Sequence, residues 1–300
     1  MQWMFGRGRC LDLGMGAVPR MMGVLNVTPD SFSDGGVYGE GSEGVSRAVA
    51  AGVAMARAGA AVIDVGGEST RPGAERVGAR KQQRRTEPVI RELVAALGEA
   101  GLGAVVSIDT TMAEVAEAAL GAGASVVNDV SGGREDAGML GLCARAGCGV
   151  ILMHMQGEPG TMQEAPAYGD VVAEVEAFLR ERLAAAEAAG IAREAVVLDP
   201  GLGFGKRLAH NVSLMGALSG WCDPAGGLGV PVLVGASRKR MIAGLSPGTT
   251  EGASDRLGGT AALTALAVAA GVRLLRVHDV RDNRQAAEVS WGLCVSGGER

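Results

Sequence analysis

The chain has 300 residues, of which 47% are hydrophobic and 20% charged, and its formal net charge is −5. A chain of this length and composition can bury one large core and is too apolar for an intrinsically disordered protein. The net negative charge gives no reason to expect nucleic acid or an anionic membrane as a partner. The five cysteines are scattered without a C-x-x-C pair, which argues against a zinc site or a disulfide framework and favours the cytoplasm.

We expect no segment for export or membrane insertion in this sequence. The charged residues Arg7, Arg9 and Asp12 precede any apolar run, so no signal peptide is expected. The most apolar long segment, residues 260–272, is too short and too rich in alanine to span a bilayer.

Short apolar runs alternate with segments of helical period along the whole chain. The predicted strands are 22–27, 61–65, 104–108, 125–130, 149–153, 195–198, 231–234 and 272–277. The predicted helices include 45–58, 87–100, 112–121, 171–189 and 259–270. Strands that are apolar on both faces and alternate with helices indicate a parallel sheet covered by helices. Eight of them favour a single-domain (β/α)8 TIM barrel over residues 1–300, with a lead-in of about residues 1–20 and a tail after about residue 291.

Nearly every predicted strand ends in a polar residue. These residues are Asn26, Asp64, Asp109, Asn128 with Asp129, His154, Asp199, Ser237, and Arg276 with His278. A strand buried on both faces has no structural need for them, and each would cost about 1–3 kcal/mol if buried without a partner. Some, such as Asp109, could instead cap the following helix. We expect most of them to converge on one bound molecule at the C-terminal end of the barrel.

Three of these strand ends suit a heterocyclic ligand. Asp109 and Asp199 offer acceptor carboxylates, and Asn128 offers both a donor and an acceptor. This set can bind the edge of a guanine-like or pterin-like ring, and Met153 could cover the face of the ring, although a methionine there is otherwise plain core.

The last two strands are followed by basic residues. Ser237 to Arg240 follow the seventh strand, and strand alternation lets Arg276 and His278 point the same way. Barrels frequently bind phosphate at this edge, so we predict an anion site, although a run of charges is more often a solvated surface. Residues 199–206 are rich in glycine but do not match a P-loop, because the spacing before Lys206 is short by one and Arg207 replaces Ser or Thr.

Two segments after the first and second strands carry further candidate residues. Asn26 can offer an oxygen to a hard cation such as Mg2+, although its segment could be an ordinary turn. In the second segment, Arg71 beside Pro72 is a preorganised donor for a phosphate or carboxylate.

The motifs resemble those of the dihydropteroate synthases, a family of folate-pathway transferases. They are MGVLNVTPDSFSDGG (22–36), GGESTRPGA (66–74), SIDT (107–110), VNDVSG (127–132), LMHMQGEPGTMQ (152–163), LDPGLGFGK (198–206), GASRKRMI (235–242) and RVHDV (276–280). They run from the first strand to the last, so the resemblance covers essentially the whole barrel.

The resemblance implies a TIM barrel that joins p-aminobenzoate to a dihydropterin methyl diphosphate and releases diphosphate and 7,8-dihydropteroate. It implies that Asp109, Asn128, Asp199 and Lys239 hold the pterin, that Asn26 binds Mg2+, and that Arg71, Arg276 and His278 bind the diphosphate. It implies that Phe32, Thr70, Pro72, Phe204 and Ser237 line the p-aminobenzoate site. Asp109, Asp199, Lys239 and Arg71 would take part in catalysis. A homodimer and a sulfonamide target are also implied.

Two other functions stay open at this point. A pterin-binding methyl-transfer domain shares the barrel and the carboxylates but needs no diphosphate site, so Arg71, Lys239 and His278 argue against it. A catalytically silent pterin-binding protein would be expected to lack these residues.

Overall fold

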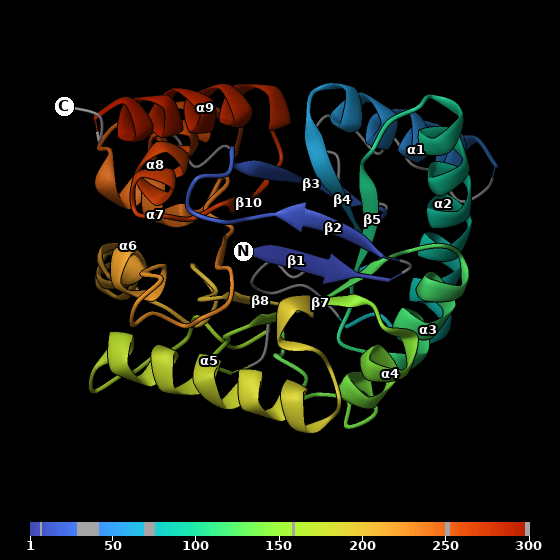
Figure 1. The fold of residues 1–300 in the computed structure, drawn as a ribbon, viewed down its shortest axis with the longest axis horizontal. Helices are drawn as coiled ribbons and strands as arrows, with labels where there is room; N and C mark the ends of the chain where they lie inside the picture. Colours follow the sequence, from blue (N-terminus) through green and yellow to red (C-terminus); the bar gives the residue numbers. More distant parts are fainter. Residues whose placement is uncertain (7, 29–41, 69–75, 158–159, 250–252, 298–300) are drawn as a thin grey trace.

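The computed structural model describes residues 1–6, 8–28, 42–68, 76–157, 160–249 and 253–297. Eight parallel strands form one sheet, in the order β8-β7-β6-β5-β4-β3-β10-β9, and helices cover its outer face (Figure 1). Between the two ends of this sheet a single bridge joins Leu198 to Val232, and the Leu198 N–H donates to the Pro231 carbonyl at 3.0 Å. The eight strands therefore curve into a ring, and the predicted (β/α)8 fold is confirmed.

The eight barrel strands lie within two residues of their predicted bounds. They are β3 (Arg20–Asn26), β4 (Ala60–Gly66), β5 (Val105–Asp109), β6 (Val126–Asp129), β7 (Gly149–Met153), β8 (Val196–Asp199), β9 (Leu233–Val234) and β10 (Leu274–Val277). The shortest is β9, which has two residues.

The helices of the described residues follow the strands in turn. They are α1 (Ser42–Arg57), α2 (Ala79–Glu99), α3 (Ala113–Gly121), α4 (Met139–Ala146), α5 (Val171–Ala188), α6 (Leu208–Trp221), α7 (Arg240–Leu245), α8 (Leu257–Ala269) and α9 (Val280–Gly297), with short 3-10 turns at η1 (Arg193–Ala195) and η2 (Ala253–Arg256). Among the described residues no helix combines the length and the apolar character that a membrane crossing needs.

Two predicted boundaries were wrong. Helix α2 begins at Ala79 rather than at residue 87, because the buried face of its first turns carries the polar side chains of Gln82 and Thr86, which hide the apolar period. The chain after residue 291 is not a separate tail, because α9 continues to Gly297.

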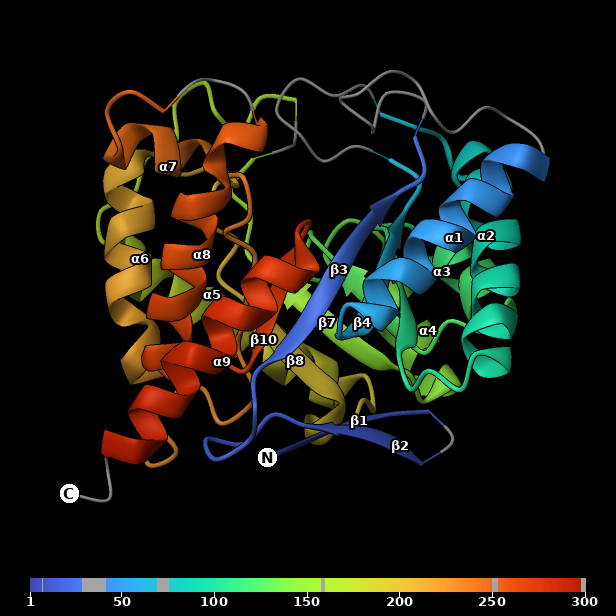
Figure 2. The same cartoon turned by 90° about the horizontal axis from the view of Figure 1, so that it is seen from above.

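The interior of the barrel begins with an apolar layer to which each strand contributes one side chain. The layer consists of Met22, Val62, Val105, Val126, Ile151, Val197, Leu233 and Leu274. Trp3, Phe5 and Leu13 of the N-terminal lead-in pack against it and are at most 4% exposed. These residues belong to the hairpin of β1 (Gln2–Phe5) and β2 (Arg9–Asp12) and to the turn after it. Figure 2 places this hairpin below the barrel, where the strands begin, so the lead-in closes that end and only the opposite end is left for a site.

Candidate active site

Most of the polar strand ends lie two or four residues beyond the apolar layer. The exceptions are Asp129 and His154, which lie three residues beyond it and contact Ser131 and Lys206 instead. Because side chains alternate along a strand, residues at steps of two or four face the barrel interior as the apolar layer does. The residues two positions on are Val24, Asp64, Ser107, Asn128, Met153, Asp199, Gly235 and Arg276. In the next layer stand Asn26, Asp109, Ser237 and His278. The barrel therefore changes from apolar to polar within one step along its axis.

An arginine bridges two carboxylates inside this polar layer. Arg276 Nε donates to Asp64 Oδ2 and Arg276 Nη2 donates to Asp109 Oδ2, both at 2.7 Å. Asn128 Nδ2 donates to the same Asp64 oxygen at 3.0 Å. The three strands β4, β5 and β10 thus bring their charged ends together, and the amide of Asn128 joins them.

These contacts decide between the two interpretations of Asp109. Helix α3 has Met112 at its N-cap position, and the N–H of its first residue, Ala113, donates to Asp136 Oδ2 at 2.8 Å rather than to Asp109. The Asp109 carboxylate instead faces Arg276 inside the barrel. The capping alternative was therefore wrong for Asp109, and the prediction that it points into the mouth is confirmed.

Burial controls the titration of the site. It raises the pKa of Asp109, an effect that the charge of Arg276 opposes and that of Asp64 adds to. It raises the pKa of Asp199 to about 6, although the Gly201 N–H and the charge of Lys239 favour the ionised form. Burial lowers the pKa of Lys239 to about 8. The mouth therefore holds ionisable groups that are costly to keep charged without a ligand, a property that is typical of functional sites.

An apolar wall stands beside the charged layer. It contains Val130, Met153, Met155, Met162 and Phe204. The Nζ atom of Lys239 lies 4.0 Å from the centroid of the Phe204 ring. A flat ligand that binds the carboxylates with its edge would therefore meet Met153, Phe204 or both with its face.

The predicted anion site is divided in the structure. Ser237 Oγ lies 3.0 Å from His278 Nδ1 and accepts the His278 N–H at 3.2 Å. Burial lowers the pKa of His278 to about 3, so its ring is neutral at pH 7. The guanidinium of Arg238, in contrast, binds both oxygens of Asp279 at 3.0 and 2.7 Å, and Arg240 is exposed. Of the run 238–240, Lys239 is therefore the residue that faces the other predicted site residues.

Asn26 is the candidate metal ligand. It ends β3, is partly buried, and lies beside Gly66, where an added Cβ would come within 3.1 Å of Asn26 Oδ1. The glycine thus leaves space around an amide oxygen, and such oxygens are donors that Mg2+ accepts. Within the described ranges there is no group of three or more His, Cys, Asp or Glu that could hold a metal alone.

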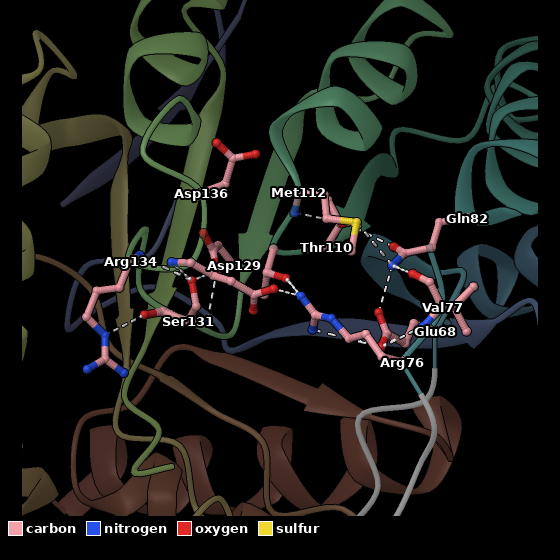
Figure 3. A network of polar contacts seen from close by, with 12 residues as sticks. Glu68, Arg76, Val77, Gln82, Thr110, Met112, Asp129, Ser131, Arg134 and Asp136 are labelled. Atoms are coloured by element: carbon pink, nitrogen blue, oxygen red, sulfur yellow. Dashed lines mark hydrogen bonds and ion pairs between the residues drawn. The ribbon is translucent and has the colours of Figure 1, made fainter. Parts of the chain in front are cut away.

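A hydrogen-bonded network borders the site on the α2 side (Figure 3). Glu68 accepts from the Val77 N–H at 3.2 Å and from Gln82 Nε2 at 2.7 Å. The Gln82 amide also donates to the Val77 carbonyl at 2.8 Å and accepts from Thr110 Oγ1 at 3.1 Å. Arg76 bonds to Glu135 and lies 3.9 Å from Glu68. The network ties the residues on both sides of segment 69–75 to the residue that follows Asp109.

Four predicted site residues lie outside the described residues: Phe32, Thr70, Arg71 and Pro72. The same is true of most of segments 28–36 and 66–74.

Asp64 and Ser107 belong to the interior polar layer, yet the sequence prediction included Asp64 only among the polar strand ends, without a specific role, and did not include Ser107. Asp64 is fully buried, and it fixes both Arg276 and Asn128. Their sequence signal was the same as that of Asp109, a polar residue inside an apolar strand, so alternation counted from the apolar layer would have identified both.

Comparison with known proteins shows what this arrangement is similar to. The family model of pterin binding enzymes matches residues 22–278. A dihydropteroate synthase of Escherichia coli is 44% identical over 286 residues, which cover 95% of this chain and 94% of that protein. The dihydropteroate synthase of Mycobacterium leprae is 47% identical over 276 residues, 90% of this chain and 92% of that one. The Xanthomonas albilineans dihydropteroate synthase, solved with 4-aminobenzoic acid, is 45% identical with a TM-score of 0.83 and covers 95% of this chain and 96% of its own.

Proposed function

Since the chain belongs to the pterin-binding enzymes and is a dihydropteroate synthase, we propose that its barrel mouth binds the dihydropterin through Asp109, Asn128 and Asp199. The enzyme is a transferase of folate biosynthesis that joins p-aminobenzoate to (7,8-dihydropterin-6-yl)methyl diphosphate. The observation that carries the proposal is the layer of buried carboxylates and one amide directly above an apolar floor. That layer offers hydrogen-bond acceptors to the amino and N–H groups of a pterin, and its floor excludes water from below.

The apolar wall gives the pterin ring a face to pack on. Met153 is 2% and Phe204 is 7% exposed, and both border the charged layer. Lys239, held near the Phe204 ring, is placed to hydrogen-bond an oxygen or nitrogen of the same ligand.

We propose that the diphosphate binds on the side of β3 and β10, which are neighbours in the sheet. Arg276, His278 and Arg71 would bind its oxygens. The contacts with Asp64 and Asp109 use two of the five N–H bonds of the Arg276 guanidinium, so the others can donate to a diphosphate oxygen. Asn26 would hold Mg2+, and the remaining ligands would be waters and diphosphate oxygens, as is usual for this ion. When bound, the ion would neutralise charge on the leaving group.

For p-aminobenzoate we propose a site lined by Phe204 and Ser237 together with Phe32, Thr70, Arg71 and Pro72. Its amine nitrogen forms a bond to the methylene carbon of the pterin, the C–O bond to the diphosphate breaks, and the diphosphate leaves with the electron pair while the amine loses a proton. If the C–O bond breaks first, the pterin ring carries the positive charge. The Asp109 and Asp199 carboxylates would then stabilise that charge.

We further propose that the chain is a cytoplasmic homodimer. The surfaces of α8 and α9 leave large apolar side chains exposed, among them Leu266 at 61% and Leu293 at 72%. Light scattering of the purified protein tests the dimer.

A dihydropteroate synthase of Yersinia pestis was solved as a sulfonamide drug complex, and we expect such drugs to bind this chain as well.

The test of the function is a titration with dihydropterin diphosphate in which diphosphate release is followed with and without p-aminobenzoate. The proposal expects release and formation of 7,8-dihydropteroate only with both substrates, or much faster with both. Excess chelator should abolish turnover and leave binding of a diphosphate-free pterin almost intact. Binding without any release would instead indicate a silent pterin-binding protein, and transfer of a methyl group would indicate the methyl-transfer alternative.

A further inference from the structure

Lys206 is a lysine buried at the end of the glycine-rich segment between β8 and α6, with 3% of its surface exposed. Its Nζ atom lies 3.0 Å from the carbonyl oxygens of Gly201 and Phe204 and 3.3 Å from that of His154. It also lies 2.9 Å from His154 Nδ1. Burial lowers the pKa of His154 to about 3, so this ring is neutral and its Nδ1 accepts a hydrogen bond from the ammonium.

These contacts leave no N–H bond of Lys206 for a phosphate. An ammonium has three N–H bonds, and four acceptors of the protein already surround this one. The glycine-rich segment therefore does not act as a P-loop, as its spacing predicted. Its lysine binds the protein's own backbone.

The backbone held by Lys206 consists of two segments pressed together. Gly201 has a φ of 65°, and a Cβ at this position would lie 1.9 Å from the His154 carbonyl oxygen. Gly205 has a φ of 60°, and its Cβ would lie 2.3 Å from the Gln156 carbonyl oxygen. Only glycine allows the segment after β8 to approach the segment after β7 so closely. The close approach turns several carbonyl groups toward one point, and the ammonium occupies that point.

The same two segments carry side chains of the proposed pterin site. Gly201, whose carbonyl binds Lys206, donates its N–H to Asp199 Oδ1 at 2.7 Å. Phe204, whose carbonyl also binds Lys206, places its ring under Lys239. Met153 immediately precedes His154. Each carbonyl that Lys206 binds therefore belongs to a residue that carries, precedes or contacts a side chain of the pterin site. Gly201 contacts Asp199, Phe204 carries its own ring, and His154 follows Met153.

We infer that Lys206 is a positioning residue of the pterin site, which fixes Asp199 and Phe204 by holding the carbonyls of Gly201, Phe204 and His154 together. The inference rests on the proposed pterin site. The enzyme keeps this lysine at a cost, since burial lowers its pKa to about 7 despite the neighbouring charge of Asp199. A lysine that only stiffened the segment after β8 would not need to be buried as a charge. The contacts of this ammonium instead meet at the segments that carry the pterin-binding side chains.

The test compares Lys206→Met, which keeps the length of the side chain and removes its donors, with Arg273→Met. Arg273 is a matched control because it is also a buried cation, 5% exposed, whose guanidinium binds the carbonyls of Met15, Val268 and Val272. It precedes β10 and so lies at the closed end of the barrel. For each variant we would measure the Kd of a diphosphate-free pterin by calorimetry, the KM of both substrates, and urea unfolding.

We expect Lys206→Met to raise the pterin Kd and the KM for dihydropterin diphosphate at least about tenfold, which corresponds to the loss of one hydrogen bond to a charged group. Arg273→Met should lose stability but keep both constants within about twofold of wild type. A folded Lys206→Met protein with a wild-type pterin Kd would overturn the inference, as would an equal loss of affinity in both variants.

If Lys206→Met does not fold, Lys206→Gln replaces it, because its amide retains two N–H donors. For Lys206→Gln we expect a pterin Kd at least about threefold above wild type, and a wild-type Kd would again overturn the inference. Failure of the wild-type protein to bind the pterin would count against the proposed function instead.

Discussion

The clearest consequence of the site geometry concerns Asp199, which we predict to lower the stability of the ligand-free enzyme. Asp199 is 6% exposed, and the pKa of its carboxyl rises from 3.8 to about 6 on folding. Between about pH 4 and pH 6 the folded state holds a proton that the unfolded state has lost. Stability therefore falls as the pH rises through this window, and the full cost of about 3 kcal/mol is present above pH 6.

Asp199→Asn removes this cost because the amide does not titrate. Its Oδ1 can still accept the hydrogen bond from the Gly201 N–H. We expect the variant to be more stable than wild type by about 0.5 kcal/mol at pH 4, about 1.5 kcal/mol at pH 5 and about 3 kcal/mol at pH 8. The same substitution should weaken pterin binding, because the ligand loses a charged acceptor.

Urea unfolding followed by tryptophan fluorescence measures the effect, since Trp3 and Trp221 are at most 3% exposed in the fold. Asp129→Asn is the control. Asp129 is also buried, but its two carboxylate oxygens accept hydrogen bonds from the Ser131 N–H, the Ser131 hydroxyl and the Gly133 N–H, and an amide cannot accept on both sides. Asp129→Asn should therefore lose stability. A gain in Asp199→Asn that is the same at pH 5 and pH 8, or no gain at pH 8, would refute the linkage to Asp199.

Three further outcomes are expected from the structure. Asp64→Asn removes the charge that holds Arg276 and Asn128, whereas Arg276 keeps its contact with Asp109. We expect the free energy of unfolding to fall by about 2–3 kcal/mol and pterin binding to weaken, and an unchanged urea midpoint would contradict this. Gly201→Ala should lower the free energy of unfolding by at least about 2 kcal/mol, because the φ of Gly201 is 65° and the added methyl group meets the His154 carbonyl oxygen. Gly216→Ala in α6 is the control: its methyl group meets nothing within 4 Å, so Tm should stay unchanged or rise. Trp3→Ala should lower the free energy of unfolding by about 3–5 kcal/mol, because a fully buried indole is removed. The KM of both substrates should stay at the wild-type value, since Trp3 closes the end of the barrel opposite the site, and a raised KM in the folded variant would contradict this.

The strands and their polar ends were predictable because a parallel barrel repeats one simple pattern. Each strand must be apolar on both faces to be buried, so a polar residue at its end has few explanations other than a ligand. Alternation then determines which side chains face inward, and Asp109, Asn128 and Asp199 were identified correctly as inward-facing strand ends. The start of α2 was not predictable in this way, because Gln82 and Thr86 are polar residues on a buried face.

The sequence by itself therefore determined the fold class, the family and the end of the barrel where the polar residues gather. Only the tertiary structure decided how the charges are paired. Arg276 and Arg238 are both arginines at the same end of the barrel, yet one lies between Asp64 and Asp109 inside it and the other binds Asp279 outside the predicted anion site. Similarly, Lys206 binds backbone carbonyls rather than a ligand. Strand periodicity is a local property of the chain, whereas an ion pair depends on residues up to 212 positions apart that meet only once the barrel has closed.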